Sequence, residues 1–290
     1  VKNSPCPKKV ILSCLHLASE CNIIQVMAII FDGRAFAAEK EFSLGIRVLG
    51  LKARGVYPKL ASILIGDNPA SELYVNLKKK AAERIGAEID VYFLPENSKF
   101  SEILQLIESL NSDDNFNGIM IQLPLPESLS EFKEKILGAI DPGKDIDGLR
   151  YDSQFLHPTS KAVIDILKEA ERSLKTNPKS VCVVGATGMV GTPLVKELRK
   201  EDYTVAEVST ETENLTEKLK TSEIVVSATG VAHLIKPDMI KDGAIVIDVG
   251  SPNGDVDPSV SAKASFITPV PGGVGPVTIS CLLENLILAC

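Results

Sequence analysis

In the first half of the chain, short apolar runs alternate with longer segments in which apolar residues recur every three or four positions. The short runs are typical of buried strands, and the longer segments are typical of amphipathic helices. Because strands separated by helices of about ten residues or more pair in parallel, the pattern predicts a parallel sheet with crossover helices. The expected strands span 59–65, 89–94 and 118–123, and the expected helices span 34–54, 71–85 and 101–111.

The alternation starts again near Thr159. Strand candidates here, such as Val181-Cys-Val-Val184, are apolar at every position, as parallel strands covered on both faces are. This half therefore predicts a doubly wound, Rossmann-like domain, so the fold class is α/β with two domains. A final helix over 278–289 is apolar on most sides, and we expect it to pack on the first domain, with a cleft between the halves. The expected strands span 180–184, 203–208, 224–228 and 244–249, and the expected helices span 160–170 and 188–199.

Length and composition fit two globular domains. The chain has 290 residues, and domains usually contain roughly 100 to 200. A net charge of −7 argues against a nucleic-acid partner, because neutralising phosphates requires an excess of Lys and Arg. Six cysteines without a CxxC pair indicate free thiols in a reducing compartment, which predicts a cytoplasmic protein without a metal site. Apolar runs fall short of the roughly 20 residues of a membrane span, so we expect no membrane association.

The first 26 residues differ in pattern from the rest. The run Val10–Leu17 resembles a signal peptide, but polar residues interrupt it and a typical cleavage site does not follow. Met27 begins a segment that is typical of the start of a domain. We therefore expect residues 1–26 to be an over-extended start outside the fold, which mass spectrometry of the natural amino terminus would test.

Three glycines, Gly185, Gly188 and Gly191, lie between a predicted buried strand and a predicted helix. In a dinucleotide-binding loop, glycines allow a tight turn and a close backbone approach to the pyrophosphate, which the free N–H groups of the helix bind. A purely structural turn is the alternative. The correct placement between strand and helix favours nucleotide binding.

A second candidate site lies on the helix that follows residues 66–70. Ser71, Tyr74 and Lys78 are spaced so that they share one side of this helix. If Lys78 reaches a cleft, desolvation would lower its pKa toward the range useful for proton transfer, and Tyr74 could stack on a flat ring. The alternative is a solvated lysine beside an N-capping serine.

Polar residues also follow the expected strand 118–123. Gln122 lies near its carboxyl end, where ligands bind in open parallel sheets. A buried amide there must find a partner in the protein or in a ligand. Asp145 and Asp147 could be loop-closing acids. The run 268–276 is rich in proline and glycine, which predicts a shaped binding loop rather than a helix or strand.

Together these segments resemble the methylenetetrahydrofolate dehydrogenase/cyclohydrolase family, along nearly all of residues 27–290. The matching segments, in the family's order, are Pro69-Ala-Ser-Glu-Leu-Tyr-Val-Asn-Leu-Lys78, Gly118-Ile-Met-Ile-Gln-Leu-Pro-Leu-Pro126, Lys144-Asp-Ile-Asp-Gly148 and Thr268-Pro-Val-Pro-Gly-Gly-Val-Gly-Pro276. The resemblance implies oxidation of 5,10-methylenetetrahydrofolate to the 5,10-methenyl form with NAD or NADP, then hydrolysis to 10-formyltetrahydrofolate. It also implies a homodimer, a folate-binding catalytic domain over 27–157 completed by 278–290, and an NAD(P)-binding domain over 158–277.

The resemblance assigns roles to individual residues. It implies that Lys78 shuttles the proton of the cyclohydrolase step, that Gln122 tunes Lys78, and that Ser71 lies nearby. Tyr74 would stack on the folate and Asp147 would hold its pterin ring. The remaining residues implied to shape the folate site are Pro271, Gly272 and Gly273. The residues implied to bind the cofactor are Gly185, Ala186, Thr187, Gly188, Gly191, Thr210, Thr229, Gly230 and Ser251.

This chain departs from the family pattern mainly in its second half. The family usually carries Gly-Arg-Ser at Gly185-Ala186-Thr187 and His-Ser at Ser209-Thr210, which Glu211 follows here. Alanine cannot pair with a 2′-phosphate and Glu211 would repel it, so we expect NAD to be preferred over NADP. The usual Pro-Cys-Thr-Pro segment appears as His157-Pro-Thr-Ser160, and the loop 250–254 is short. We expect neither change to touch a catalytic residue.

Three other functions would account for parts of this pattern. A short-chain reductase would also combine Gly-Ala-Thr-Gly with Tyr74 and Lys78, but its Tyr/Lys pair follows the glycine loop, whereas here it precedes the loop. A cyclohydrolase without hydride transfer would explain Ala186, and reduction of the nicotinamide distinguishes it. A folate- or nucleotide-binding module without catalysis predicts that Lys78→Ala changes no activity, but binding alone does not require an acid/base group.

Overall fold

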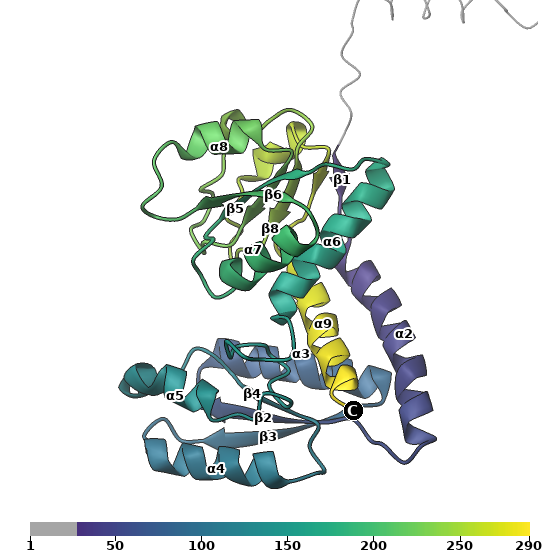
Figure 1. The fold of residues 1–290 in the computed structure, drawn as a ribbon, viewed down its shortest axis with the longest axis vertical. Helices are drawn as coiled ribbons and strands as arrows, with labels where there is room; N and C mark the ends of the chain where they lie inside the picture. The colour runs from purple at the N-terminus through teal and green to yellow at the C-terminus, as the bar shows by residue number, and fades with distance from the viewer. Residues whose placement is uncertain (1–27) are drawn as a thin grey trace, which may run out of the picture.

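The computed structural model describes residues 28–290. The expected extra segment 1–26 lies outside these residues. Figure 1 shows two α/β lobes, each built on a parallel sheet, with the long helices α2 (Gly33–Lys52) and α9 (Val274–Leu288) running between them. One sheet has three strands in the order β3-β2-β4, and the other has six in the order β1-β9-β8-β7-β5-β6. The predicted two-domain α/β class is confirmed.

The first lobe is organised around β2 (Lys59–Ile65), which pairs with β3 (Glu88–Leu94) and β4 (Gly118–Ile121). Successive residues of β2 point to opposite faces, so the strand contributes to two cores. Leu60 packs beneath α2, α3 (Pro69–Ile85) and α9, whereas Ile63 packs beneath α4 (Phe100–Ser112) and α5 (Lys133–Gly138). The sequence pattern did not predict α5 or the 3-10 turn Glu127–Phe132 that precedes it.

The second lobe is a doubly wound sheet. Its strands are β5 (Ser180–Val184), β6 (Thr204–Val208), β7 (Ile224–Ser227), β8 (Ile245–Asp248) and β9 (Phe266–Ile267). Helices α6 (Pro158–Leu174) and α7 (Gly191–Lys200) cover one face. The other face carries α8 (Leu215–Thr221) and the short turns Pro237–Met239 and Pro258–Ala262. Val183 and Cys182 enter opposite cores, which explains why β5 is apolar throughout.

Strand β1 (Ile29–Ile30) pairs with β9 in the second sheet, although the sequence analysis expected the residues after Met27 to begin the first domain. Its flanking N–H groups donate to Ser265 and Ile267 at 2.9 Å, and Phe31 packs on Phe266 with ring centroids 5.6 Å apart. Two paired residues are too few to produce a readable periodicity. The chain therefore enters the fold in the second lobe and reaches the first along α2.

Helix α9 belongs to both lobes. Its first half, including Val277 and Cys281, packs in the core of the second lobe, and its last turns, including Leu283 and Leu286, pack in the core of the first. The expected packing on the first domain therefore describes only its end. The helix also begins at Val274, because a proline within the first turn leaves no hydrogen bond unmade. Across residues 28–290, every helix is too short or too polar to span a bilayer.

Candidate active site

Helix α3 begins with a side-chain cap that fixes the positions of its polar residues. The Asn68 side chain accepts hydrogen bonds from the N–H groups of Ala70 (3.0 Å) and Ser71 (3.2 Å), and a proline occupies the first turn. Ser71 is 3% exposed, so it faces the interior rather than solvent. Tyr74 and Lys78 follow along this side, one and two turns further.

Lys78 turns toward the carboxyl end of β4. Its Nζ donates to Gln122 Oε1 at 3.0 Å and lies 3.7 Å from Met120 Sδ. Burial lowers the pKa of Lys78, and the negative charge of Asp147 partly opposes that shift. A solvated lysine on an exposed helix face, the alternative from the sequence, does not describe this geometry. The amine is placed where a lowered pKa favours proton exchange near neutral pH.

Gln122 is held by both ends of its amide. Its backbone N–H donates to Ile63 of the central strand at 2.8 Å, which places the side chain just past the end of β4. Its Nε2 donates to the Leu123 carbonyl at 2.7 Å, so Oε1 is the atom that faces Lys78. An acceptor in this position stabilises the ammonium form and fixes its direction.

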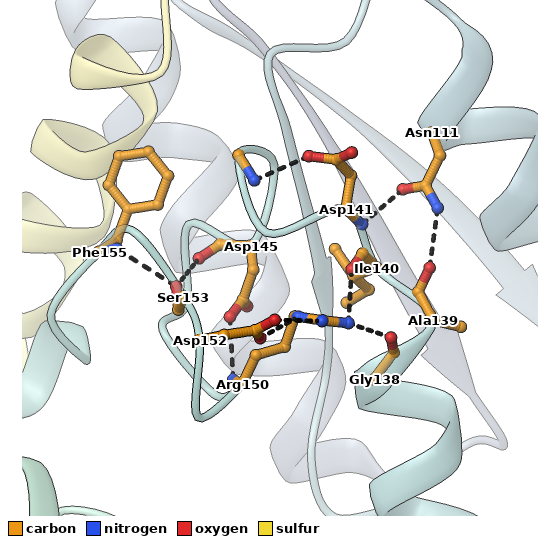
Figure 2. A network of polar contacts seen from close by, with 11 residues as sticks. Asn111, Gly138, Ala139, Ile140, Asp141, Asp145, Arg150, Asp152, Ser153 and Phe155 are labelled. Carbon is orange, nitrogen blue, oxygen red and sulfur yellow. Dashed lines mark hydrogen bonds and ion pairs between the residues drawn. The ribbon is translucent and has the colours of Figure 1, made fainter.

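The loop after α5 is closed by its own polar contacts, which Figure 2 shows from close by. The Asp145 carboxylate accepts from the Arg150 N–H at 2.9 Å, and Ser153 Oγ donates to the Asp145 carbonyl at 3.1 Å. The Arg150 guanidinium bonds the carbonyls of Gly138 and Ile140 and pairs with Asp152 at 2.8 Å. Burial raises the pKa of Asp145, and the hydrogen bond from the Arg150 backbone N–H opposes the rise. Asp145 is thus a loop-closing acid.

Asp147 differs from Asp145 in what its charge acts on. Asp147 is half-buried, and its negative charge raises the pKa values of Lys78 and His157. The two acids that their residue type and position alone left equivalent are therefore separated by their contacts. Asp145 shapes the loop, and Asp147 is the one whose charge acts on Lys78.

His157 is a residue that the sequence analysis set aside. It is 9% exposed, and its Nδ1 has no hydrogen-bond partner within residues 28–290. Burial and the positive charge of Lys78 lower the pKa of His157, and Asp147 raises it. The expectation that the change at 157–160 touches no catalytic residue stays a prediction, although this segment lies beside that of Asp147, since a Cβ on Gly148 would lie 2.7 Å from the His157 backbone nitrogen. The signal was present as a polar residue in place of the family's proline.

In the second lobe, the three glycines form a tight turn between β5 and α7. Gly185 has φ +85°, and a Cβ there would lie 2.4 Å from the Ala228 carbonyl oxygen. A Cβ on Gly191 would lie 2.1 Å from the Gly185 carbonyl oxygen. Both positions therefore require glycine. The predicted helix start at 188 is corrected to Gly191, because residues 186–190 form the turn itself.

The other residues of this turn divide into buried and exposed. Ala186 is 2% exposed and its N–H donates to the Val208 carbonyl at 3.0 Å, so its side chain points into the protein. Thr187 and Gly188 are exposed ahead of the amino end of α7. Thr210 is exposed after β6, beside Glu211. These exposed positions share the carboxyl edge of the sheet, where a ligand is expected in a doubly wound fold.

Two buried aspartates that the sequence analysis missed hold the remaining loops of this edge. Asp255 Oδ2 accepts from Ser227 Oγ (2.9 Å) and from the N–H (2.7 Å) and Oγ1 (2.8 Å) of Thr229. Asp248 accepts from the N–H groups of Gly250, Asp255 and Val256 at 2.8 to 3.0 Å. Burial raises the pKa of Asp248, and these N–H groups oppose the rise. An acid at the end of the apolar run 245–248 was the available signal. Gly230, with φ +69°, completes the turn after Thr229.

The two lobes meet at candidate residues from each. The hydroxyl oxygens of Tyr74 and Ser251 lie 3.0 Å apart and share a hydrogen bond. The loop before α9 lies beside α2, since a Cβ on Gly33 would lie 1.9 Å from the Gly273 carbonyl oxygen. Pro271 is exposed and Gly272, with φ +104°, is half-buried. The expectation that 268–276 contains no helix was wrong for its last three residues, which form the first turn of α9.

Comparison with known proteins gives one family model for each half of the chain. The model for the tetrahydrofolate dehydrogenase/cyclohydrolase catalytic domain matches residues 31–147, and the model for the NAD(P)-binding domain of the same family matches residues 157–290. The chain belongs to this family. The bifunctional protein FolD of Lactobacillus acidophilus is 41% identical to this chain. The match covers 90% of this chain and 96% of that protein.

Solved structures agree with this membership. The bifunctional enzyme FolD of Campylobacter jejuni matches with a TM-score of 0.83 at 39% identity, covering 89% of this chain and 96% of that one. The Trypanosoma brucei methylenetetrahydrofolate dehydrogenase-cyclohydrolase, complexed with NADP cofactor and an inhibitor, matches with a TM-score of 0.82 at 34% identity. It covers 91% of this chain and 97% of that one. The predicted family is confirmed.

The second lobe of this tetrahydrofolate dehydrogenase/cyclohydrolase chain fits a nicotinamide dinucleotide. The glycine turn leaves no room for side chains between β5 and α7, so backbone N–H groups can approach a pyrophosphate. Thr187, Gly188 and Thr210 are exposed at the same edge. The buried side chain of Ala186 means that any cofactor contact at this residue is made by its backbone.

A group of metal-ligand type lies away from this edge. Asp165, Cys281 and Glu284 come together where α2, α6 and α9 meet. Lys40 Nζ lies 2.7 Å from Asp165 and 2.6 Å from Glu284, and Lys161 Nζ lies 2.9 Å from Glu284. Two ammonium groups already balance the two carboxylates, so the group fits an ion-pair network between helices rather than a cation site.

Proposed function

We propose that this chain oxidises 5,10-methylenetetrahydrofolate to 5,10-methenyltetrahydrofolate with a nicotinamide dinucleotide, and then hydrolyses the product to 10-formyltetrahydrofolate. The observation that carries this proposal is the inward Lys78 Nζ, 3.0 Å from Gln122 Oε1 and one helical turn from Tyr74, whose hydroxyl contacts Ser251 of the nucleotide-binding lobe. One substrate bound beside Tyr74 would thus lie within reach of both lobes.

Oxidation requires positioning more than acid/base chemistry. The methylene carbon lies between two folate nitrogens, whose lone pairs stabilise the cation that forms as the hydride leaves. The bound nicotinamide supplies the hydride acceptor. The protein's task is to hold the carbon in reach, and effective alignment of this kind contributes about 7 to 11 kcal/mol to barrier lowering in favourable cases. In this proposal Tyr74 stacks on the folate, Asp147 holds the pterin, and Pro271, Gly272 and Gly273 shape the site.

Hydrolysis requires proton transfer, which we assign to Lys78. Water adds to the methenyl carbon and loses a proton. The adduct opens as the pterin nitrogen gains a proton and its bond to carbon breaks, and the hydroxyl proton is released as the formyl C=O forms. The lowered pKa of Lys78, caused by burial, makes the neutral amine more accessible for the first transfer and the ammonium a better acid for the second. Gln122 directs the amine, and Ser71 lies buried two turns earlier on α3.

We infer that NAD is preferred over NADP. Ala186 offers no charged group to a 2′-phosphate, and the exposed Glu211 after β6 would repel one. The ratio of kcat/KM for the two cofactors tests this inference. A strong preference for NADP would overturn it.

We also propose that the chain forms a homodimer in the cytoplasm. Phe42, Ile46 and Leu49 are exposed along one side of α2, an apolar surface suited to a second copy. A hollow of about 560 Å³ beside the edge strand β3, lined by Val75 and Phe93 among others, supports the same proposal. Sedimentation of the purified chain and of Ile46→Glu tests the dimer, which the charge should dissociate.

The deciding experiment assays both steps separately. Purified protein is given methylenetetrahydrofolate with NAD or NADP, and reduced nicotinamide is followed by absorbance. It is also given methenyltetrahydrofolate without cofactor, and loss of the methenyl absorbance is followed. Both activities are expected. Hydrolysis without nicotinamide reduction would show a cyclohydrolase alone, and neither activity would overturn the proposal.

A further inference from the structure

His157 forms a buried polar position beside the candidate catalytic residues. It is 9% exposed at the start of α6, and its Nδ1 lacks a hydrogen-bond partner within residues 28–290. A buried polar atom without a partner destabilises a fold. A role in stability alone therefore does not account for an imidazole at this position.

The backbone at this position does not require histidine either. His157 has φ −49° and ψ 127°, which proline adopts, and Pro158 follows. Its N–H donates no hydrogen bond within the described part of the chain. Proline, the residue that the family usually carries here, would thus fit the same backbone. What histidine adds is the ring.

Asn285 on α9 holds the segment of His157 against that of Asp147. Its Nδ2 donates to the Ile146 carbonyl and to the Leu156 carbonyl, both at 2.9 Å. Ile146 directly precedes Asp147, and Leu156 directly precedes His157. The segments also touch directly, since a Cβ on Gly148 would lie 2.7 Å from the His157 backbone nitrogen. The side chains of Asp147 and His157 therefore start from adjacent, fixed backbone.

The charged groups to consider around the ring lie on four elements. Lys78 on α3 lowers the pKa of His157, after burial as the larger cause, and Asp147 in the loop after α5 raises it. Lys161, one turn along α6, is paired with Glu284 of α9 at 2.9 Å. Because burial and Lys78 outweigh Asp147, the imidazole is neutral at neutral pH and available to accept a proton.

We propose that His157 is a positioning residue for the hydrolysis step, where it acts through Lys78 and takes up the proton that each turnover sets free. This inference rests on the proposed cyclohydrolase activity. As the water oxygen bonds to the methenyl carbon, Lys78 takes one water proton. The pterin nitrogen receives that proton when its bond to carbon breaks. The remaining hydroxyl proton leaves as the formyl C=O forms, is taken up by Lys78, which is again neutral, and passes to neutral His157 and then to bulk water.

The coupling between His157 and Lys78 is tested without any activity, by NMR titration of the histidine rings. His157→Gln identifies the signal, and the exposed His233 is the internal control. Removing the ammonium in Lys78→Met should shift the His157 titration to higher pH, and Asp147→Asn should shift it to lower pH, while His233 stays unchanged. If neither substitution shifts the His157 titration, the proposal is overturned.

The catalytic role is tested by the pH dependence of the two separate activities. His157→Gln and His157→Pro should each slow hydrolysis of methenyltetrahydrofolate by about tenfold, below the usual range for a direct acid or base, and abolish an acid-side ionisation of kcat. Oxidation of methylenetetrahydrofolate should stay within about twofold, because positioning governs it. His233→Asn, which suits the positive φ there, is the matched control.

Two outcomes of this assay would count against His157. An unchanged pH profile, or an equal loss of both activities, would indicate a structural role only. If the unaltered protein hydrolysed no methenyl substrate, the proposed function would fail. The NMR titration would still decide whether the charge of Lys78 affects the titration of His157.

Discussion

Replacing Asn285 with alanine should loosen the active site, although Asn285 lies on α9, a helix to which we assign no acid or base of the site. Asn285 is 1% exposed, and its Nδ2 makes two hydrogen bonds of 2.9 Å to carbonyls of two different loops. Alanine removes the donor for both and leaves the Ile146 and Leu156 carbonyls facing a gap of amide size. Water can reach that gap only if the surrounding loops move.

The expected loss of stability follows from these contacts. Each hydrogen bond contributes about 0.5 to 1.5 kcal/mol net, and each acceptor left unsatisfied in the interior costs about 1 to 3 kcal/mol. Since the Leu156 carbonyl is only partly buried, its cost falls at the lower end. We therefore expect Asn285→Ala to lower the free energy of unfolding by about 2 to 4 kcal/mol.

Urea unfolding followed by circular dichroism, at a fixed protein concentration, measures this change. The exposed Asn115→Ala, whose side chain bonds the nearby Asp113, is the matched control and should change stability by less than about 0.5 kcal/mol. Hydrolysis by Asn285→Ala should fall more than methylene oxidation, because the loops of Asp147 and His157 lose their common anchor. A loss below about 1 kcal/mol with hydrolysis intact would refute the reasoning.

Three further substitutions separate the two activities and the cofactor site. Lys78→Met should abolish hydrolysis and stabilise the protein at neutral pH, because burial lowers the pKa of Lys78 in the folded state. The unfolded chain therefore binds more protons than the folded one, so the stability of the unaltered protein rises with pH. The difference between the urea midpoints of the variant and the unaltered protein should thus become smaller above neutral pH. Gly191→Ala, whose Cβ would lie 2.1 Å from the Gly185 carbonyl oxygen, should lower methylene oxidation by roughly a hundredfold and leave hydrolysis of methenyltetrahydrofolate within about twofold in the separate assays. Glu211→Lys should raise the ratio of kcat/KM for NADP over NAD on the order of tenfold, and an unchanged ratio would show that this side chain does not face the 2′ position.

The sequence predicted the parts of the fold that depend on local pattern. The strand at 59–65 has the expected bounds because it is the centre of its sheet and nearly every residue of it is buried. The helix of Ser71, Tyr74 and Lys78 was recognisable from the spacing of its residues, although its cap is Asn68 and it begins at Pro69, two residues before the predicted start. The geometry of such a motif is determined by residues close together in the sequence, so its chemistry could be inferred before the fold was known.

Contacts between distant segments could not be predicted in this way. The two-residue strand β1 exists only because β9 offers it a free edge. Asp255 and Thr229 are 26 positions apart, and Asn285 is separated from Ile146 by 139. His157 is far from Lys78 in sequence, and the segments of His157 and Asp147 are held together by Asn285, through the carbonyls of Leu156 and Ile146. A polar residue gains its role from such partners, which periodicity does not record.

Helix α9 links these observations, because residues along its length position each part of the site. Its first residue follows Gly273, which fixes the loop proposed to shape the folate site against α2. Glu284 joins Lys40 and Lys161 on two other helices, and Asn285, the next residue, anchors the loops of Asp147 and His157. The lobes are therefore joined by packed helices and a shared charge network rather than by a flexible linker. A substitution that shifts α9 should disturb the folate loop, the acid/base residues and the Tyr74–Ser251 contact together, since all three depend on where this helix lies.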